Sequence, residues 1–455
     1  MKKFLIAALV AIALILTILP LSMGLVAQGY FAFAFDNLHA RLPKQYEQIF
    51  GTLPVDLKLK SYAGGLFGAK TVSELVVADG SPDDGRELLV IESDVSYGWH
   101  FTKAFPYLHL VKAHTIVRLS KELQSALLIR LIPIFDEGKI LEGDIYFTPK
   151  IAGSGVLATP AVSIGYILDA KPIIISYNYG IGARATHIAI DWSSFSIADK
   201  DTQERGIIEG VRLTIDGNVL DINDDAKLEF AIKQMSVSDI MKLENLNIKN
   251  AQTIKGGAYN GLNEFSFDLF EGRNTHEYKY YKIDRAFLSI ASSNLDHESL
   301  VKLRDFALND DENYWLDDKE KLSKEILPLL AKCVRNVNIT VKLTIRVGDK
   351  SWDLDANVRL NPEVPFPDFT DIDAIDPKDL LKMAIVDLDW SAHEEIFKLF
   401  GSESSLNSDD LERSIDEGYF KRENGVLSAK VHLENGVFTV NGKTPAELKN
   451  WIDSI

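Results

Sequence analysis

Cysteine is nearly absent from this 455-residue chain, in which Cys333 is the only one. A single thiol excludes an intrachain disulfide framework and any zinc or iron-sulfur site built from several cysteines. Cys333 follows Ile326 and Leu330 at helical spacing, and a cysteine in that setting usually packs as a small apolar side chain. We therefore predict a buried, structural thiol.

Basic residues are also scarce. The chain has 49 Lys and Arg against 66 Asp and Glu, which gives a net charge of −17 and a pI near 5.1. Such a surface repels the phosphates of nucleic acids and of anionic lipids over most of its area, so we expect no nucleic-acid binding. Apolar residues (46%) and charged residues (25%) are close to globular averages, which excludes a disordered chain and a polytopic membrane protein.

Motifs of the common hydrolases and metal sites are missing. The sequence has no G-x-S-x-G elbow and no P-loop, and "HEEIF" at 393–397 lacks the second histidine of a zinc-binding H-E-x-x-H. The two nearest histidines, His109 and His114, are five residues apart and would point to opposite faces of a strand. We expect no metal site, no cofactor and no catalytic residue that could be named from sequence.

Two further motifs match a binding site only in part. "YGIGARA" at 179–185 has the glycine spacing of a dinucleotide fingerprint, but Ile188, Ile190 and Trp192 follow at strand period where that fingerprint needs a helix. "DINDDA" at 221–226 begins like a calcium loop but has Ala226 where glycine is required. A β-hairpin and a solvated turn are the better interpretations.

The N-terminus carries one long apolar run. Phe4 to Ala27 contains no charged residue and follows Lys2 and Lys3, so it is long enough to cross a bilayer as a helix. Small residues at Ser22 and Gly24 leave a cleaved signal peptide as the alternative. The flanking lysines place the N-terminus in the cytoplasm. We predict a single-pass inner-membrane protein with most of its chain in the periplasm of a Gram-negative bacterium.

The last part of the sequence predicts a hairpin. Apolar residues alternate with polar ones from Leu427 to Leu433, and Asn435-Gly436 supplies the residues of a type I′ turn. This register places Leu433 opposite Phe438 and Val431 opposite Val440. Thr444-Pro445 then resembles the start of a short closing helix that runs to Ile455.

A longer hairpin is predicted from Val337 to Leu360, where apolar residues alternate on both sides of Gly348-Asp349-Lys350. A helix interrupted near Pro328 precedes it, and the same order of helix and hairpin recurs at 407–440. Other expected strands are 172–179, 186–195, 211–215, 227–232 and 264–270, and other expected helices are 120–128, 237–246 and 380–384.

These patterns predict an α+β fold, mainly antiparallel β-sheet with short interspersed helices that cover one face of each sheet, after an N-terminal transmembrane helix. The expected regions are residues 1–28 as the anchor or uncleaved signal, 29–250 as a β-rich exported region, and 251–455 as a region of helices and hairpins. The composition shifts most in the acidic segment 308–321 and in residues 361–377, and neither is of low complexity.

Three C-terminal blocks, residues 329–362, 376–401 and 411–445, resemble in order and spacing the YdgA-like bacterial proteins, a family of undetermined biochemical function. The most specific piece is "GVFTVNGK" at 436–443. The resemblance implies a β-rich protein that is anchored in the inner membrane and faces the periplasm. It implies no catalytic residues.

We therefore expect a non-enzymatic cell-envelope protein that acts as a periplasmic binding or scaffold module, because exposed edges of β-ribbons can accept partner strands. Its partners would be the inner membrane, through Phe4 to Ala27, and an envelope protein or lipid. One alternative is a carrier of lipid or another hydrophobic ligand on an apolar concave sheet, similar only in architecture to AsmA-type lipid-transport proteins. The other is an envelope hydrolase that uses carboxylates.

Overall fold

The computed structural model describes residues 55–444 except for 65–67, 78–84, 101–108, 126–137, 148–151, 181–186, 200–201, 203, 218–221, 275–278, 310–321, 368–376 and 397–407. The expected anchor at 4–27 and the expected closing helix at 445–455 lie outside the described residues. Among the helices that are described, none has the length and hydropathy needed to cross a bilayer.

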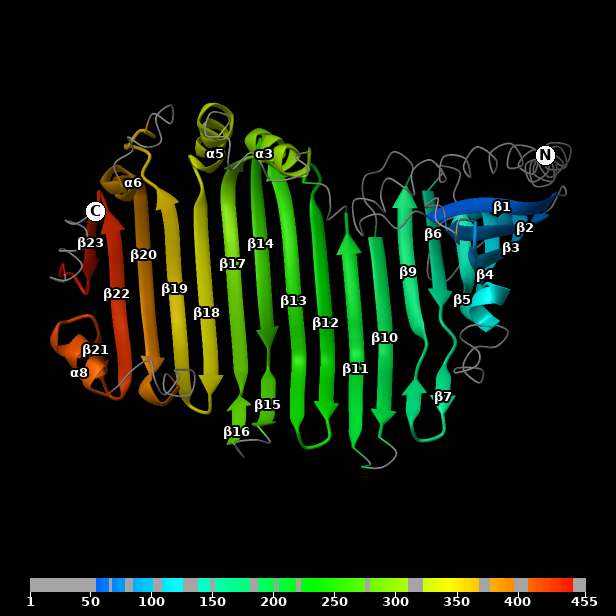
Figure 1. The fold of residues 1–455 in the computed structure, drawn as a ribbon, viewed down its shortest axis with the longest axis horizontal. Coiled ribbons are helices and arrows are strands. Elements are labelled where there is room, and N and C mark those ends of the chain that lie inside the picture. Colours follow the sequence, from blue (N-terminus) through cyan, green and yellow to red (C-terminus); the bar gives the residue numbers. More distant parts are fainter. Residues whose placement is uncertain are drawn as a thin grey trace, which may run out of the picture. The chain divides into compact units, whose positions relative to one another are not determined.

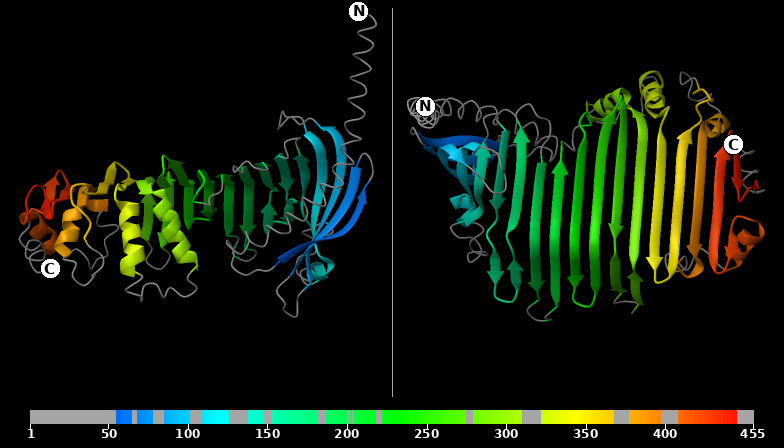
Figure 2. Two further views of the ribbon diagram at one scale, coloured as in Figure 1. Left: turned by 90° about the horizontal axis from the view of Figure 1, so that it is seen from above. Right: turned by 180° about the vertical axis from the view of Figure 1, so that it is seen from behind.

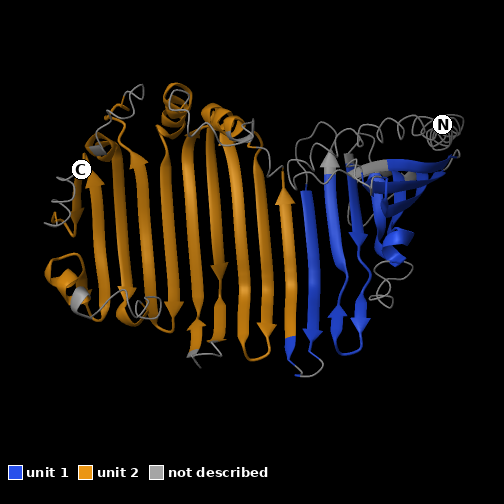
Figure 3. Ribbon diagram, viewed as in Figure 1, with its two compact units in different colours: residues 1–205 blue, residues 206–455 orange. Residues whose placement is uncertain are grey.

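The chain forms two compact units, residues 1–205 and 206–455 (Figure 3). The sequence-based division into 29–250 and 251–455 differs from this. Asn250 lies inside a strand of the second unit that is paired on both sides, so the sheet continues through the expected boundary.

Unit 1 is an antiparallel sheet (Figure 1). Its spatial order is β1-β2-β3-β4-β5-β6-β9-β10, and the small hairpin β7–β8 lies beside β10. The strands are β1 (Val55–Gly64), β2 (Gly68–Val77), β3 (Glu87–His100), β4 (His109–Leu119), β5 (Lys139–Phe147), β6 (Ala152–Ala158), β7 (Val162–Ile164), β8 (Leu168–Ala170), β9 (Ile173–Gly180) and β10 (His187–Ala198).

Small side chains form the core of unit 1. Ala69, Val95 and Ala113 lie side by side on β2, β3 and β4 and are buried together with Tyr97. The strands β1–β5 bend strongly (Figure 2). Tyr62, Val111 and Ile145 pack against this cluster, so the core of β1–β5 lies on the face that carries Ala69 and Ala113.

Unit 2 is also made of antiparallel strands, in the order β11-β12-β13-β14-β17-β18-β19-β20-β22-β23; β15–β16 extends from β13, and β21 pairs with β22. The strands are β11 (Arg205–Asp216), β12 (Ala226–Val237), β13 (Met241–Lys255), β14 (Ala258–Phe267), β15 (Leu269–Asn274), β16 (Lys279–Ile283), β17 (Arg285–Asp296), β18 (Asn338–Val347), β19 (Lys350–Leu360), β20 (Ala384–His393), β21 (Lys421–Glu423), β22 (Val426–Glu434) and β23 (Val437–Val440).

The helices of unit 2 are short and lie mainly near the ends of strands. They include α3 (His297–Asn309), the π-helix η3 (Leu322–Ile326), α5 (Leu327–Val334), α6 (Pro377–Met383) and α8 (Ser408–Asp416). Figure 1 shows α3, α5 and α6 beyond the ends of the strands. The expectation that helices cover one face of each sheet is therefore not met by α3, α5 and α6, which leave the middle of the unit 2 sheet without a helix over it.

The mainly antiparallel fold with few short helices is confirmed. So is the register of the last hairpin, in which Leu433 pairs with Phe438 and Val431 with Val440. The long hairpin is also confirmed as β18–β19, with Val347 opposite Lys350. The helix predicted at 237–246 is wrong, because those residues form the turn from β12 to β13 and the start of β13.

Candidate functional site

One face of the unit 2 sheet is apolar across its whole width. Residues that pair directly on neighbouring strands point to the same face. A single row of such pairs, here called the apolar row, consists of Leu213, Phe230, Ile248, Phe265, Leu288, Leu343, Leu354, Trp390 and Ala429. The face that carries this row is called the apolar face below.

The apolar face is buried at its C-terminal end and exposed in its middle. Leu427 and Ala392, on β22 and β20, are 0% exposed. In contrast, Ile248 on β13 and Phe265 on β14 are each 37% exposed, and Ile290 on β17 is 40% exposed. Exposed apolar side chains that lie next to one another mark candidate binding surfaces more strongly than scattered ones.

A pair of amides borders this exposed patch. Asn250 and Asn263 lie opposite each other on β13 and β14, on the apolar face, and Asn263 also lies opposite Ile290. The Asn250 Nδ2 donates to Asn263 Oδ1 at 2.6 Å. Both side chains are exposed. The patch therefore has hydrogen-bonding groups along one side.

The pairing between strands is interrupted along one row that runs across β11 to β14, and the apolar residues lie on the same face on both sides of this row. Gly210 and Asn245 have positive φ values of +63° and +54°, and they lie in line with Lys233 and Asp268 where pairing is interrupted. The Asn245 Nδ2 donates to Asp268 Oδ2 at 2.9 Å. We call this row the crease. Beyond it a second apolar row continues through Ile208, Met235, Leu243, Phe270 and Ile283.

Ring contacts show that the two apolar rows share a face. Phe265 and Phe267 pack edge to face with ring centroids 5.9 Å apart, and Phe267 contacts Phe270 at 6.3 Å. In a regular strand, residues three apart point to opposite faces. The phase of β14 therefore changes at Asp268, and the aromatic side chains form one cluster that crosses the crease.

The opposite face of the same sheet is charged. Lys342, Asp355, Asp389 and Lys430 form one row across β18, β19, β20 and β22. The Lys342 Nζ lies 3.4 Å from Asp355 Oδ2, and the Lys430 Nζ lies 2.9 Å from Asp389 Oδ2. Exposed ion pairs contribute little to stability, about 0–1 kcal/mol each. Their main effect is to keep this face in water.

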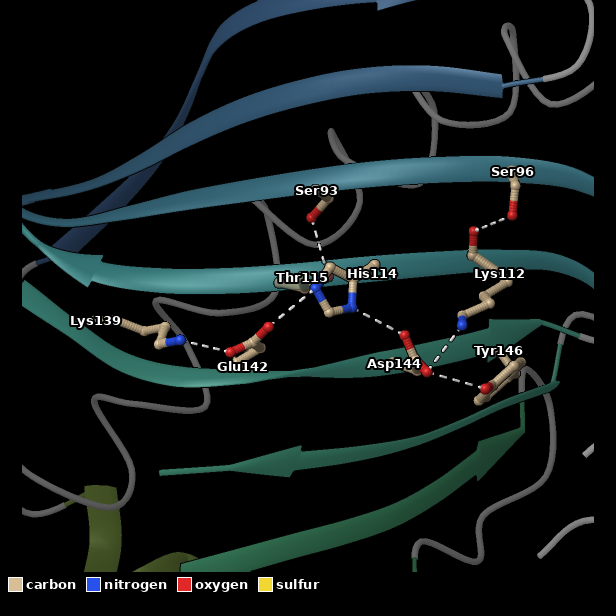
Figure 4. Close-up of polar contacts among 9 residues, drawn as sticks. All are labelled: Ser93, Ser96, Lys112, His114, Thr115, Lys139, Glu142, Asp144 and Tyr146. Atoms are coloured by element: carbon tan, nitrogen blue, oxygen red, sulfur yellow. Dashed lines mark hydrogen bonds and ion pairs between the residues drawn. The ribbon is translucent and has the colours of Figure 1, made fainter. Parts of the chain in front are cut away.

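Unit 1 carries a more connected polar cluster, centred on His114 of β4 (Figure 4). Its Nδ1 lies 3.0 Å from Asp144 Oδ1, and its Nε2 lies 3.3 Å from Glu142 Oε1. Lys112 contacts Asp144 Oδ2 at 2.9 Å, and Lys139 contacts Glu142 Oε2 at 2.7 Å. Each ring nitrogen of His114 thus faces a carboxylate that a lysine also holds.

The charges in this cluster favour ionised carboxylates. Burial raises the pKa of Asp144, but the hydrogen bonds from Lys112 and His114 lower it by more, so the pKa lies below its ordinary value. The bond from Lys139 lowers the pKa of Glu142. Burial raises the pKa of Tyr146, which donates to Asp144 Oδ2 at 3.2 Å.

A similar arrangement occurs in unit 2 at His432 of β22. Its Nδ1 lies 2.7 Å from Asp387 Oδ1 on β20, and its Nε2 lies 3.4 Å from Glu434 Oε2. The hydrogen bond with Asp387 raises the pKa of His432. The His432 side chain therefore keeps its proton to a higher pH than an isolated imidazole. In the part of the chain that the structure describes, no group of His, Cys, Asp and Glu has the arrangement of a metal site.

Comparison with known proteins identifies the family. The family of bacterial proteins of unknown function DUF945 matches residues 160–446, which is more than half of the chain. The chain belongs to DUF945. Neither a curated protein nor a solved structure shows significant similarity to it.

The structure of this DUF945 member shows what surrounds the two partial motifs, the glycine-rich segment 179–185 and the calcium-like segment 221–226. Gly180 ends β9, and β10 pairs antiparallel with β9 from His187 onward, so the glycine-rich segment joins two strands and no helix begins at 187. Ala226 of the calcium-like motif is the first residue of β12. His114 and His109 lie on the same strand, β4, as expected. The prediction for Cys333 is confirmed, since its thiol is buried in α5.

Sequence reasoning missed the surfaces that stand out in this DUF945 member. The pairing of His114 with Asp144 depends on the register of β4 and β5, and no turn motif in the sequence predicts that register. The exposed patch depends on where the helices lie. A signal for the crease was present, because glycine and asparagine are the residues that most readily adopt positive φ, but each stands alone in its strand.

Proposed function

We propose that this DUF945 protein is a non-enzymatic binding protein of the bacterial cell envelope, anchored in the inner membrane by Phe4 to Ala27 with both units in the periplasm. We further propose that the apolar face of unit 2 is its binding surface. The observation that carries this proposal is the exposed patch of Ile248, Phe265 and Ile290 on a face that is otherwise continuous and apolar.

The apolar patch favours a hydrophobic occupant. Burying the exposed part of three such side chains stabilises a complex by an amount that grows with area, at about 25 cal/mol per Å². The face across the sheet carries ion pairs and would lose hydration if it were covered. This contrast supports carriage of a lipid or another hydrophobic ligand as the second candidate function, within the same binding role.

The carboxylates give less support to the third alternative, an envelope hydrolase. A carboxylic acid that donates a proton in catalysis needs a raised pKa. The pKa values of Asp144 and Glu142 lie below their ordinary values, and each carboxylate is held by a lysine. The His114 cluster is therefore better suited to fixing the β4–β5 register than to acid catalysis.

Site-specific photo-crosslinking in living cells tests the binding surface on the full chain. A photoreactive phenylalanine analogue is placed at Phe265, on the apolar face, or at Ser266, the next residue on the opposite face. We expect adducts from position 265 and few from 266. Equal adducts from both positions, or none from 265, would contradict the proposal.

The location is tested separately. Membranes that carry the full chain are washed with carbonate, and spheroplasts are treated with protease. We expect the protein to stay with the washed membranes and to be degraded from outside the inner membrane. A chain that is released by carbonate, or that is protected in intact spheroplasts, would overturn the envelope part of the proposal.

A further inference from the structure

The geometry of the exposed patch points to one class of ligand. We propose that the apolar face of unit 2 binds a lipid with an uncharged, hydrogen-bonding head group, with the head at the Asn250–Asn263 pair and the acyl chain along β14 and β15 toward Phe270. This inference rests on the proposed function, because it names the ligand of the same surface.

The first argument is charge. The exposed patch and its neighbours on β13, β14 and β17 are all uncharged. They are Ile248, Phe265 and Ile290 of the patch, the bordering amides Asn250 and Asn263, and Leu288. A charged head group would find no counter-ion among them, and desolvating an unpaired charge is costly. The chain as a whole carries a net charge of −17, which repels an anionic lipid. The same charge opposes pairing of two copies through this face.

The second argument is hydrogen bonding at one side only. Within the described residues, the Asn263 side chain takes part in one hydrogen bond, in which its Oδ1 accepts from Asn250 Nδ2. An amide nitrogen has two donor hydrogens and an amide oxygen has two acceptor positions. The pair therefore keeps both donors and acceptors for a ligand, which matches hydroxyl and ester groups.

The row beyond the amide pair carries no apolar side chain on these three strands. Two residues beyond the amide pair lie Gln252 on β13, Gly261 on β14 and Ser292 on β17, all in one row. In the other direction lie Phe265, Phe267 and Phe270. The patch is thus polar at one end and apolar at the other, as an amphipathic ligand requires.

The third argument is length. From Phe265 to Phe270 the chain advances five residues, or about 17 Å at about 3.4 Å per residue. One leaflet of a bilayer is about 15 Å deep, half of a hydrocarbon core of about 30 Å. The aromatic track that crosses the crease is therefore long enough for one acyl chain. Without the change of phase at Asp268, Phe270 would point to the charged face and the track would end at Phe267.

Photolabelling of the full-length protein in phosphatidylcholine nanodiscs tests the inference. Two probes carry a diazirine in the hydrocarbon chain: a 1-monoacylglycerol and an alkane of equal chain length. After irradiation, labelled peptides are mapped by mass spectrometry. We expect both probes to label residues 258–274, and the monoacylglycerol to label them more strongly.

Variants separate the head group from the chain. Asn263→Leu removes the amide and keeps the side chain's size, so we expect labelling by the monoacylglycerol to fall about fivefold, the value of one hydrogen bond, with alkane labelling unchanged. Asn250→Leu is the second variant and should act in the same way. Phe265→Asp should abolish labelling by both probes, while Ser266→Asp, on the opposite face, should change neither. Circular dichroism verifies that each variant is folded.

The outcomes distinguish the inference from the function on which it rests. If the alkane labels the patch but both asparagine variants leave monoacylglycerol labelling unchanged, the amide pair does not bind the head group and the inference is wrong, while the binding surface stands. If neither probe labels residues 258–274, or if labelling is unaffected by Phe265→Asp, the inference fails together with lipid carriage, and photo-crosslinking at Phe265 decides separately whether the binding surface stands.

Discussion

Leu433 on β22 lies directly opposite Phe438 on β23, and the two central residues of the turn that joins these strands, Asn435 and Gly436, both have positive φ values, +53° and +75°. A two-residue turn of this kind needs left-handed backbone at both central positions. The turn therefore sets which side chains of the hairpin meet on the apolar face.

Gly436→Ala should weaken this hairpin. A side chain in the left-handed region costs about 1–2 kcal/mol, and a Cβ at Gly436 would lie 3.2 Å from the Cγ of Lys382, a flexible neighbour. We expect the free energy of unfolding to fall by about 1 kcal/mol in urea titrations. The control is Asn435→Gly, which fits the same φ and should change stability little. A larger loss in the control than in Gly436→Ala would show that the turn does not act in this way.

The buried C-terminal end and the exposed middle of the apolar face should also differ in how much each side chain contributes to stability. Leu427 is 0% exposed, whereas Ile248 is 37% exposed. We expect Leu427→Ala to lower the free energy of unfolding by about 2–5 kcal/mol and Ile248→Ala to lower it by about 1 kcal/mol or less. Thermal and urea unfolding measure both. Similar losses at the two positions would mean that the patch is part of a closed core and not a binding surface.

The sequence predicts the hairpins well because their signals are local. Asn435-Gly436 and Gly348-Asp349 each lie between two strands of strict alternation, so turn type and pattern fix the register together. Pairing between strands that are distant in the chain has no such signal. Asp387 and His432, on β20 and β22, are brought together only by the order of the sheet.

The helix predicted at 237–246 fails for a physical reason found in the crease. Asn245 has left-handed backbone, so the apolar positions of β13 change from Met241 and Leu243 to Leu246 and Ile248. The break in alternation produces spacings of three, which resemble a helix. Sequence alone cannot separate a strand that changes phase from a short amphipathic helix.

The exposed patch could not be predicted because it depends on which elements lie over a sheet. The helix that was expected before the long hairpin, interrupted near Pro328, includes α5 in the structure, but α5 lies near the end of β17 and not across the sheet (Figure 2). Alternation in β13 and β14 indicates that one face is apolar. It does not indicate whether that face is covered.

Asp144 should make the stability of unit 1 depend on acid pH. Its pKa is lowered in the folded protein, so its contribution is full above the unfolded value, about 4, and is lost as the pH falls through the folded value. We expect Asp144→Asn to destabilise the protein at pH 7, and the difference from the wild type to shrink below pH 4 in urea titrations. Asp94→Asn is the matched control, because that carboxylate is exposed and lies 3.7 Å from Lys70. A constant difference between pH 7 and pH 3 would rule out the ionic role of Asp144.

The contribution of His432 to folding stability should depend on pH in the opposite sense. The groups that face it are Asp387 on β20, Glu434 on its own strand and Thr439, its partner on β23. Its pKa is raised in the folded protein, so its contribution is present below the unfolded value, about 6.5, and is lost as the pH rises through the folded value. We expect the wild type to exceed His432→Gln in stability by more at pH 5.5 than at pH 8.5. In the Asp387→Asn background, which removes the main cause of the raised pKa, this dependence should largely disappear; if it persists, a group other than Asp387 controls the titration of His432.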